Sequence, residues 1–464
     1  MRLPDNFIYG GATAAYQCEG AVESHGKGKV AWDDYLKEEG RFQPEPASDF
    51  YHQYPQDLKL CHTFGLNGIR ISISWSRIFP NGEGEVNQEG VAFYHNLFKE
   101  CRKQQVEPFV TLHHFDTPDL LHIQGDFLSQ HTIDCFVNYA RYCFQEYSEI
   151  NYWITFNEAW PVAVNQYIAG TFPPCEKFQY DKALKSMHHM MIAHARAVCQ
   201  YKSMSGTGKI GIIHSLEGKY PYQDTPLDHQ AAEKEDALAN RYLLDLTFRG
   251  SCSSKTKKLL SEILQANHTD YDFTANEELL KEAASQNDFL GINYYQSSFV
   301  HAYEGENNIH HNGSGDKGTS IYQLKGIGEH ILPDDIERTD WDWLIYPEGL
   351  YDMVVRIAQD YPDYNTLYIT ENGLGYKDEI EDDIIMDQER IDYIRKHLEA
   401  IAKACAQGIH VRGYFVWSLM DVFSWSNGYN KRYGLFYVDY KTQRRYPKAS
   451  AYWFQQVIQC QDTR

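Results

Sequence analysis

Eight short apolar runs, separated by amphipathic stretches, constrain the fold of this chain more than any other feature. We expect β-strands at 7–15, 68–75, 108–114, 152–158, 209–214, 288–294, 366–371 and 411–418. Apolar strands that alternate with helices imply parallel βαβ units, each with a right-handed crossover. Eight such repeats favour a closed (β/α)8 TIM barrel over an open, doubly wound sheet. The predicted fold class is therefore α/β.

Helical periodicity marks most of the stretches between these strands. We expect helices within 50–64, 88–104, 132–147, 182–201, 231–248 and 390–407. The polar, glycine-rich segment 301–335 follows the sixth predicted strand. We interpret it as an elaborated loop over the C-terminal face of the strands, with a passive insertion as the alternative. No internal repeat or linker divides the chain, so we expect a single domain spanning 1–464.

The formal net charge of −21 restricts the partners of this protein. A negative global field repels nucleic acid and anionic membranes, so we expect neither partner, and an anionic small molecule needs a local cationic pocket. The first residues lack the basic segment and apolar run of a signal peptide. The ten cysteines stand singly, at no metal or redox spacing. We expect a cytoplasmic protein without a metal or other cofactor, and the oligomeric state stays open.

Two glutamates at strand ends are the first candidate functional residues. Glu158 ends the sequence TFNE at 155–158, and Glu371 lies in ITENG at 369–373. A carboxylate at the mouth of a buried strand loses solvation unless it is paired, so two of them suggest a reaction centre. Two unrelated surface ion pairs are the alternative. Cleavage of a glycosidic bond requires one acid to protonate the leaving oxygen and one carboxylate to face the anomeric carbon.

Three motifs in order along the chain resemble a known family. The sequences GGATAAYQ at 10–17, TFNE at 155–158 and ITENG at 369–373 together resemble the family 1 glycoside hydrolases. The resemblance implies a retaining β-glycosidase on a (β/α)8 barrel, with Glu158 as general acid/base and Glu371 as nucleophile. Retention implies that the two carboxyl groups stand about 5 to 5.5 Å apart. Glu158 should then keep its proton while Glu371 stays ionised.

An arginine inside a barrel strand needs a carboxylate partner. Arg70 falls in the predicted strand 68–75, and Glu371 is the obvious partner, with Tyr295 as a hydroxyl donor to the same carboxylate. A structural ion pair with another acid is the alternative for Arg70. We therefore add Arg70 and Tyr295 to the predicted catalytic residues.

The resemblance also implies a set of sugar-binding residues. Four positions match it: Gln17 and His114 for the 3- and 4-hydroxyls, Asn157 for the 2-hydroxyl, and Asn293 for the sugar close to the nucleophile. We expect Trp417 to lie under the sugar ring and Trp343 to line the leaving-group site. Core packing is the alternative for each tryptophan.

A serine at position 424 departs from the family pattern for neutral sugars, where a glutamate usually binds the 4- and 6-hydroxyls. Ser424, with Lys431 and Tyr433, resembles the branch of the family that cleaves 6-phosphoglycosides. A 6-phosphate carries about −1.5 to −2 charges at neutral pH, so a glutamate would repel it. Hydroxyl and ammonium groups would bind it through charge-assisted hydrogen bonds. A solvated loop charge is the alternative for Lys431, and Arg432 stays outside the predicted site.

The identity of the sugar depends on Trp425. The branch that acts on 6-phosphogalactosides also carries tryptophan at this position, and an indole N–H near the axial 4-hydroxyl would favour galactose. The expected reaction is hydrolysis of 6-phospho-β-D-galactosides, such as lactose 6-phosphate, to galactose 6-phosphate and the aglycone. Two alternatives remain open: a 6-phospho-β-glucosidase, and an inactive barrel that binds glycans or proteins. Retention of both glutamates and Arg70 favours an active enzyme over the inactive barrel.

Overall fold

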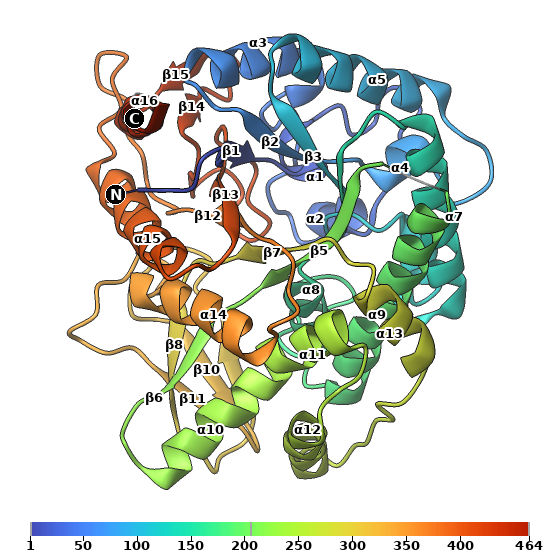
Figure 1. Ribbon diagram of the computed structural model, residues 1–464, viewed down its shortest axis with the longest axis vertical. Coiled ribbons are helices and arrows are strands. Elements are labelled where there is room, and N and C mark those ends of the chain that lie inside the picture. Colours follow the sequence, from blue (N-terminus) through green and yellow to red (C-terminus); the bar gives the residue numbers. More distant parts are fainter. Residues whose placement is uncertain (1, 205–206, 463–464) are drawn as a thin grey trace.

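The computed structural model describes residues 2–204 and 207–462, and its centre is a closed barrel of parallel strands (Figure 1). The barrel consists of β1 (Ile8–Ala12), β2 (Gly68–Ser72), β3 (Glu107–His113), β4 (Tyr152–Asn157), β5 (Lys209–Ser215), β7 (Phe289–Asn293), β12 (Leu367–Asn372) and β13 (Val411–Trp417). Each strand pairs with the next in this order, and β1 closes the barrel by pairing with both β2 and β13. The predicted TIM barrel and all eight of its strands are confirmed.

Aromatic rings fill the interior of the barrel near the start of its strands. The ring of Phe109 lies 4.9 Å from that of Phe415 and 5.2 Å from that of Tyr368, measured between ring centroids. Gly10 and Gly68 make room for Phe415, since a Cβ atom at either position would collide with or crowd its ring. The barrel is therefore a packed core rather than a pore, and space for a ligand is left at the carboxyl ends of the strands.

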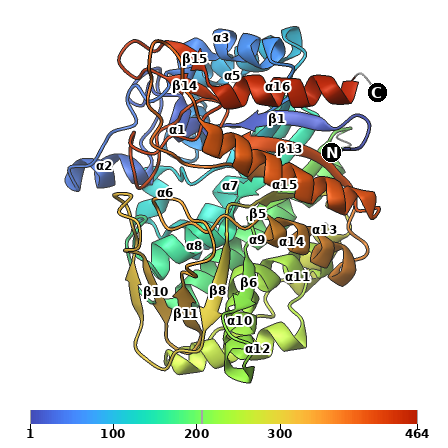
Figure 2. The same cartoon turned by 90° about the vertical axis from the view of Figure 1, so that its left-hand side faces the viewer.

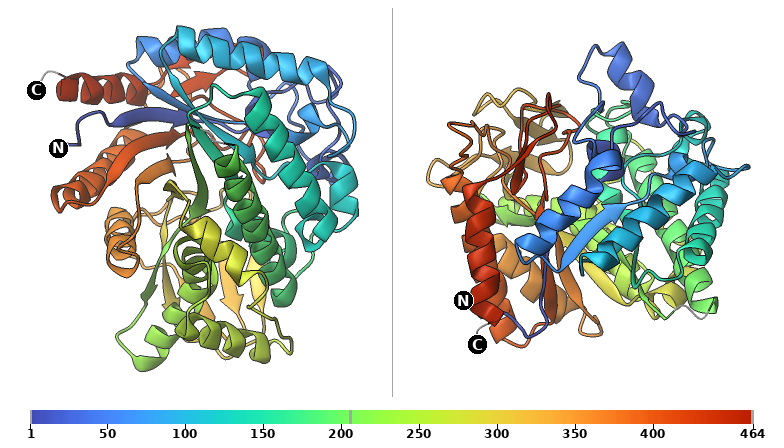
Figure 3. Two further views of the ribbon diagram at one scale, coloured as in Figure 1. Left: turned by 45° about the vertical axis from the view of Figure 1, so that its right-hand side comes forward. Right: turned by 90° about the horizontal axis from the view of Figure 1, so that it is seen from above.

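Helices surround the barrel (Figures 1 and 3). Five expected helices are confirmed: α3 (Phe50–Thr63), α5 (Gln88–Lys103), α7 (Gln130–Glu146), α9 (Tyr180–Ser203) and α15 (Gln388–Ala406). The helix expected within 231–248 is instead α10 (Pro226–Asp236), a π-helical turn (Ala237–Arg241) and α11 (Tyr242–Arg249). The sequence analysis did not predict α12 (Ser254–Ala266), α13 (Glu277–Ala284), α14 (Pro347–Asp360) and α16 (Ala449–Asp462).

The interpretation of 301–335 as a loop is wrong in part, because the segment contains three strands. These strands are β9 (Asn308–His310), β10 (Ile321–Leu324) and β11 (Gly328–Ile331). They form a five-stranded sheet with β6 (Gly218–Pro221) and β8 (Ser297–His301), in the order β6-β8-β11-β10-β9. Figure 2 shows β6, β8, β10 and β11 beside α10, away from β1 and β13. Antiparallel pairing of β9 with β10, of β10 with β11 and of β11 with β8 satisfies backbone polar groups in a segment that composition alone assigned to a loop.

The beginning and the end of the chain pack together. In Figures 1 to 3, β1 and α16 lie side by side, and the rings of Tyr9 and Phe454 stand 6.2 Å apart. Short helices and one hairpin complete the fold: α1 (Ala15–Cys18), α2 (Ala31–Glu38), α4 (Trp75–Ile78), α6 (Asp119–Ile123), a 3-10 turn (Asp126–Leu128), α8 (Ala159–Tyr167), β14 (Phe436–Val438) and β15 (Arg445–Pro447). Among the described residues, the helices include none with the length and apolar character needed to cross a membrane.

Candidate active site

Glu158 and Glu371 meet at the carboxyl ends of the barrel strands. Glu158 follows the last residue of β4 with a φ of +56° and precedes α8, and its side chain is buried. Glu371 lies inside β12 and is buried too. Asn293, at the end of β7, donates a hydrogen bond to Glu158 Oε1 at 2.8 Å and stands opposite Glu371 in the strand register. The structure thus brings both predicted glutamates to the same amide side chain.

The carboxylate of Glu371 has two strong hydrogen-bond donors. Arg70, fully buried in β2, donates to Glu371 Oε1, and the Tyr295 hydroxyl donates to Oε2 at 2.5 Å. Arg70 also donates to Thr111 Oγ1 at 3.2 Å and to Asn157 Oδ1 at 2.7 Å, which fixes its guanidinium plane. The expected pairing of Arg70 and Tyr295 with Glu371 is therefore present.

The two carboxyl groups differ in their electrostatic surroundings. Burial, followed by the negative charge of Glu371, raises the pKa of Glu158 to about 8, while a hydrogen bond from Asn293 opposes the rise. Burial also raises the pKa of Glu371, and Arg70 and the Tyr295 hydroxyl oppose it. Glu158 is therefore protonated at neutral pH. Glu371, the only one of the two with a cation as its hydrogen-bond donor, is the better placed to carry a negative charge.

Three more of the predicted sugar-binding residues surround this centre. Asn157 Oδ1 accepts a hydrogen bond from Asn293 at 2.9 Å, and its amide nitrogen lies 3.2 Å from His114 Nε2. The His114 ring stacks on Trp417 with a centroid distance of 5.9 Å. A hydrogen-bonded and stacked row therefore runs from Trp417 through His114 and Asn157 to Asn293.

Gln17, Ser424 and Trp425 form a second group. Gln17 Nε2 donates to the Phe423 carbonyl at 2.7 Å, while its Oε1 is buried and has no hydrogen-bond partner among the described residues. Ser424 Oγ donates to Asn427 Oδ1 at 3.3 Å. Within residues 2–204 and 207–462, no hydrogen bond joins the side chain of Ser424 to Lys431 or Tyr433.

The indole of Trp425 belongs to an aromatic cluster. Its ring stacks on Tyr16 at 5.2 Å and lies 4.5 Å from the ring of Trp32. Phe115 and Phe172 pack against it as well. Packing therefore accounts for most of its surface, and its expected role beside a sugar hydroxyl stays a prediction.

A cavity of about 350 Å³ opens beside the acid. Glu158, Tyr295 and Trp343 are the predicted site residues in its lining. The rest of the lining comes from α8 and the residues after it, from β8 and the residue before it, and from the segment that holds β9, β10 and β11. Residues at and after the end of β5, one residue of α10 and the neighbours of Trp343 complete it. The expectation that 301–335 borders the mouth of the barrel is therefore supported, although the segment is a sheet.

Lys431 is a buried lysine without an anionic partner among the described residues. Its ammonium nitrogen lies 3.7 Å from the ring centroid of Trp343, 4.6 Å from that of Trp341 and 5.2 Å from that of Tyr433. Among the described residues, no carboxylate forms an ion pair with it, and burial alone lowers its pKa well below the ordinary value. The indole Nε1 of Trp341 is likewise buried without a partner in that part of the chain. Two unpaired donors beside a cavity are suited to an anion.

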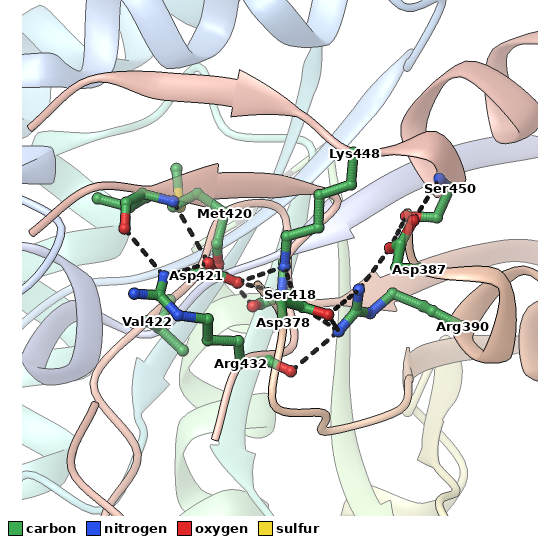
Figure 4. A network of polar contacts seen from close by, with 12 residues as sticks. Asp378, Asp387, Arg390, Ser418, Met420, Asp421, Val422, Arg432, Lys448 and Ser450 are labelled. Atoms are coloured by element: carbon green, nitrogen blue, oxygen red, sulfur yellow. Dashed lines mark hydrogen bonds and ion pairs between the residues drawn. The ribbon is translucent and has the colours of Figure 1, made fainter. Parts of the chain in front are cut away.

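A buried ionic network supports the segment that carries Lys431 (Figure 4). It joins three acids to three bases: Asp378, Asp387 and Asp421 with Arg390, Arg432 and Lys448. Arg432 donates to Asp421 Oδ2 at 2.6 Å, and its own carbonyl accepts from Arg390 at 3.0 Å. Arg432, which was left outside the predicted site, therefore has a structural partner in Asp421. Because the network is internally neutral, it supplies no counter-charge to Lys431.

The match to a family model agrees with this geometry. The model described as "Glycosyl hydrolase family 1" matches residues 1–463. The chain belongs to glycosyl hydrolase family 1.

Curated relatives within this family are similar over nearly the whole chain. A protein of Leptotrichia buccalis named 6-phospho-beta-galactosidase is 57% identical over 463 residues, which cover 99% of each chain. A protein of Streptococcus equi subsp. zooepidemicus with the same name is 58% identical over 458 residues, 98% of each chain.

Solved structures of the family share the fold. A family 1 β-glucosidase from Thermotoga maritima is 31% identical with a TM-score of 0.87, covering 99% of this chain and 98% of that one. A GH1 β-glucosidase from Exiguobacterium antarcticum B7 is 33% identical with a TM-score of 0.89, covering 100% and 99%.

Sequence reasoning missed several polar residues of the cavity. Trp341, Glu217, Lys219 and Gln296 all line it. The rule that barrel chemistry sits after the carboxyl ends of strands could have identified Glu217, two residues beyond β5, and Gln296, three beyond β7. A potential metal-ligand group was missed as well: donor atoms of Glu83, His131 and Cys135 lie within 4.8 Å of one another. They hydrogen-bond to each other outside the cavity lining, and we assign no metal to them.

Proposed function

We propose that this protein is a retaining 6-phospho-β-galactosidase, which hydrolyses substrates such as lactose 6-phosphate to galactose 6-phosphate and the aglycone. The observation that carries the proposal is the buried ammonium of Lys431 without a carboxylate partner among the described residues. A phosphate dianion would supply the missing counter-charge. The names of the relatives at 57% and 58% identity agree with this substrate.

The proposed reaction is a double displacement. The carboxylate of Glu371 attacks the anomeric carbon, the glycosidic bond breaks, and Glu158 gives its proton to the leaving oxygen. Glu158 then takes a proton from water, which cleaves the glycosyl–Glu371 ester. Arg70 and Tyr295 hold the Glu371 carboxylate in place through their hydrogen bonds. This division of roles agrees with a pKa of about 8 for Glu158.

The remaining predicted residues bind the glycon in this proposal. Gln17, through its unpaired Oε1, and His114 contact the 3- and 4-hydroxyls; Asn157 contacts the 2-hydroxyl, and Asn293 the sugar beside the nucleophile. Trp417 lies under the ring and Trp343 beside the leaving group. The group that binds the 6-phosphate consists of Lys431, Tyr433 and Ser424, and Trp425 faces the 4-hydroxyl.

We also propose that residues 1–464 form one domain in the cytoplasm. A continuous hydrophobic core that includes Leu3 and Ile458 supports the single domain. Ten free cysteines, six of them buried, support a reducing compartment. The side chain of Asn312, in an N-glycosylation sequon, is buried and donates hydrogen bonds to Asp316 and Asp340, which is consistent with a site that receives no glycan.

The decisive experiment compares four nitrophenyl glycosides, galacto and gluco, each with and without the 6-phosphate. The proposal expects the highest kcat/KM for the 6-phosphogalactoside. A preference for the 6-phosphoglucoside would replace it with a 6-phospho-β-glucosidase. Binding without hydrolysis of any of the four would favour an inactive barrel instead.

A further inference from the structure

The cavity beside Glu158 extends to residues without a part in the reaction proposed above. Part of its lining is apolar and comes from α8: Trp160, Pro161 and Val164. Another part is polar and follows β5 and β7: Glu217, Lys219, Gln296 and Ser298. The two kinds of surface together form a slot with apolar and hydrogen-bonding walls.

Glu217 is held in place by hydrogen bonds of both its backbone and its side chain. Its backbone N–H donates to Asn240 Oδ1 at 3.2 Å, and its carbonyl accepts from Asn240 Nδ2 at 2.8 Å. Its carboxylate accepts from Lys219 at 2.7 Å, Ser298 at 3.2 Å and Gln296 at 3.2 Å. The carboxylate is therefore fixed in position before any ligand arrives.

The charge and exposure of Glu217 suit it to accept further hydrogen bonds. Burial disfavours its charged form, but Lys219 outweighs this effect and lowers the pKa of Glu217, so the carboxylate is ionised. Its side chain is 27% exposed, whereas Lys219 is 4% and Glu235, which also binds Lys219, is 3% exposed. All three charged groups line the cavity, and Glu217 is the most exposed of them, which leaves its carboxylate able to accept further hydrogen bonds.

We propose that Glu217 determines the specificity for the leaving group: its carboxylate accepts hydrogen bonds from the hydroxyl groups of a neutral ring bound in this slot, the leaving-group site of the proposed function. The inference rests on the proposed function, because protonation of the leaving oxygen by Glu158 places the leaving group in the cavity that Glu158 lines. A sugar has apolar ring faces and hydroxyl edges, which match the two kinds of wall. Glu217 is thus a specificity-determining residue: a nitrophenyl leaving group offers no hydroxyl donor to its carboxylate.

The test compares two phosphorylated substrates with different leaving groups. Values of kcat/KM are measured for lactose 6-phosphate and for o-nitrophenyl 6-phospho-β-galactoside with the parent, Glu217→Gln and Gln296→Leu. A hydrogen bond to a charged group is stronger than one to a neutral group. In Glu217→Gln, the ratio of kcat/KM for lactose 6-phosphate to kcat/KM for the nitrophenyl compound should therefore fall at least about tenfold. Gln296→Leu, which removes one donor to the carboxylate, should shift the ratio in the same direction by less.

Glu306→Gln is the matched control, because Glu306 is 83% exposed and pairs with Lys325 outside the cavity lining. Its ratio should equal that of the parent. An unchanged ratio in both cavity variants, with unfolding temperatures near that of the parent, would overturn this inference and leave the proposed function intact. A parent enzyme that cleaves neither compound would instead refute the proposed function, and the subsite with it.

Discussion

The ammonium nitrogen of Lys431 lies 3.7 Å from the centre of the Trp343 ring, in a place where the described residues offer it no carboxylate. An unpaired buried charge destabilises the unliganded protein. The same charge would provide charge-assisted hydrogen bonds to a phosphate. Stability and selectivity therefore oppose each other at this residue.

Lys431→Met should consequently separate the two properties. The kcat/KM for nitrophenyl 6-phospho-β-galactoside should fall about 10- to 100-fold, since hydrogen bonds to charged groups contribute roughly 1.5 to 3 kcal/mol. The unfolding temperature without ligand should rise. Lys377→Met is the control, because Lys377 lies 5.6 Å from the Trp341 ring but is 53% exposed and pairs with Asp340. Equal activity of Lys431→Met and the parent on the phosphorylated compound would contradict the phosphate assignment.

Glu371→Ala should abolish hydrolysis, because the variant has no carboxylate to attack the anomeric carbon. Sodium azide should restore turnover of an activated nitrophenyl substrate by attacking from the vacated side, and the product should be the α-glycosyl azide. Chromatography and NMR of the product check this outcome. A β-azide would point to loss of the acid/base rather than the nucleophile.

The alkaline limb of the pH profile should reflect Glu158. Its pKa of about 8 keeps the carboxyl group protonated at neutral pH, so kcat/KM should fall as the pH rises through about 8. Substrates with leaving groups that need no protonation, such as a dinitrophenyl glycoside, should lose less activity over the same range. Identical profiles for both kinds of substrate would argue against Glu158 as the acid.

The same raised pKa predicts a pH-dependent cost in stability. The folded protein keeps this proton up to about pH 8, whereas an ordinary glutamate in the unfolded chain releases it near pH 4.5. Glu158 therefore lowers the free energy of unfolding progressively as the pH rises from about 4.5 to about 8. Glu158→Gln removes this effect. Its free energy of unfolding should therefore exceed that of the parent by a few kcal/mol at pH 8 but not near pH 4.5, as measured by urea denaturation at both values.

Asp421→Asn tests the buried network behind the Lys431 segment. The variant leaves Arg432 and Lys448 without a shared carboxylate, and loss of one partner of a buried ion pair costs about 3 to 5 kcal/mol. Asp383→Asn is the control, since the Asp383–Arg444 pair is 62% and 61% exposed and should contribute about 0 to 1 kcal/mol. Thermal unfolding of both variants would distinguish a supporting network from an incidental one.

Local sequence patterns were enough to predict much of the fold and part of the candidate site. Apolar runs and helical periodicity predicted eight barrel strands and five of the helices, because burial of one face imposes a period that the sequence must show. The segment 301–335 was misjudged because its strands are short and because only the pairing of β11 with β8, a strand that ends where the predicted loop begins, joins them to the rest of the sheet. Glu217 was not predicted either, because the residues that fix its carboxylate include Gln296 and Ser298, which are distant from it in sequence, as well as Lys219.

The sequence by itself determined the barrel, the two glutamates and the serine at 424, since periodicity and motif lie along the chain. Only the tertiary structure decided that Asn293 joins Glu158 to the strand of Glu371, that Arg432 pairs with Asp421, and that no carboxylate of the described residues pairs with Lys431. The physical reason is that a charge's surroundings consist of residues from other strands. Burial and pairing across those strands set the pKa values and the unpaired donors on which the proposed chemistry depends.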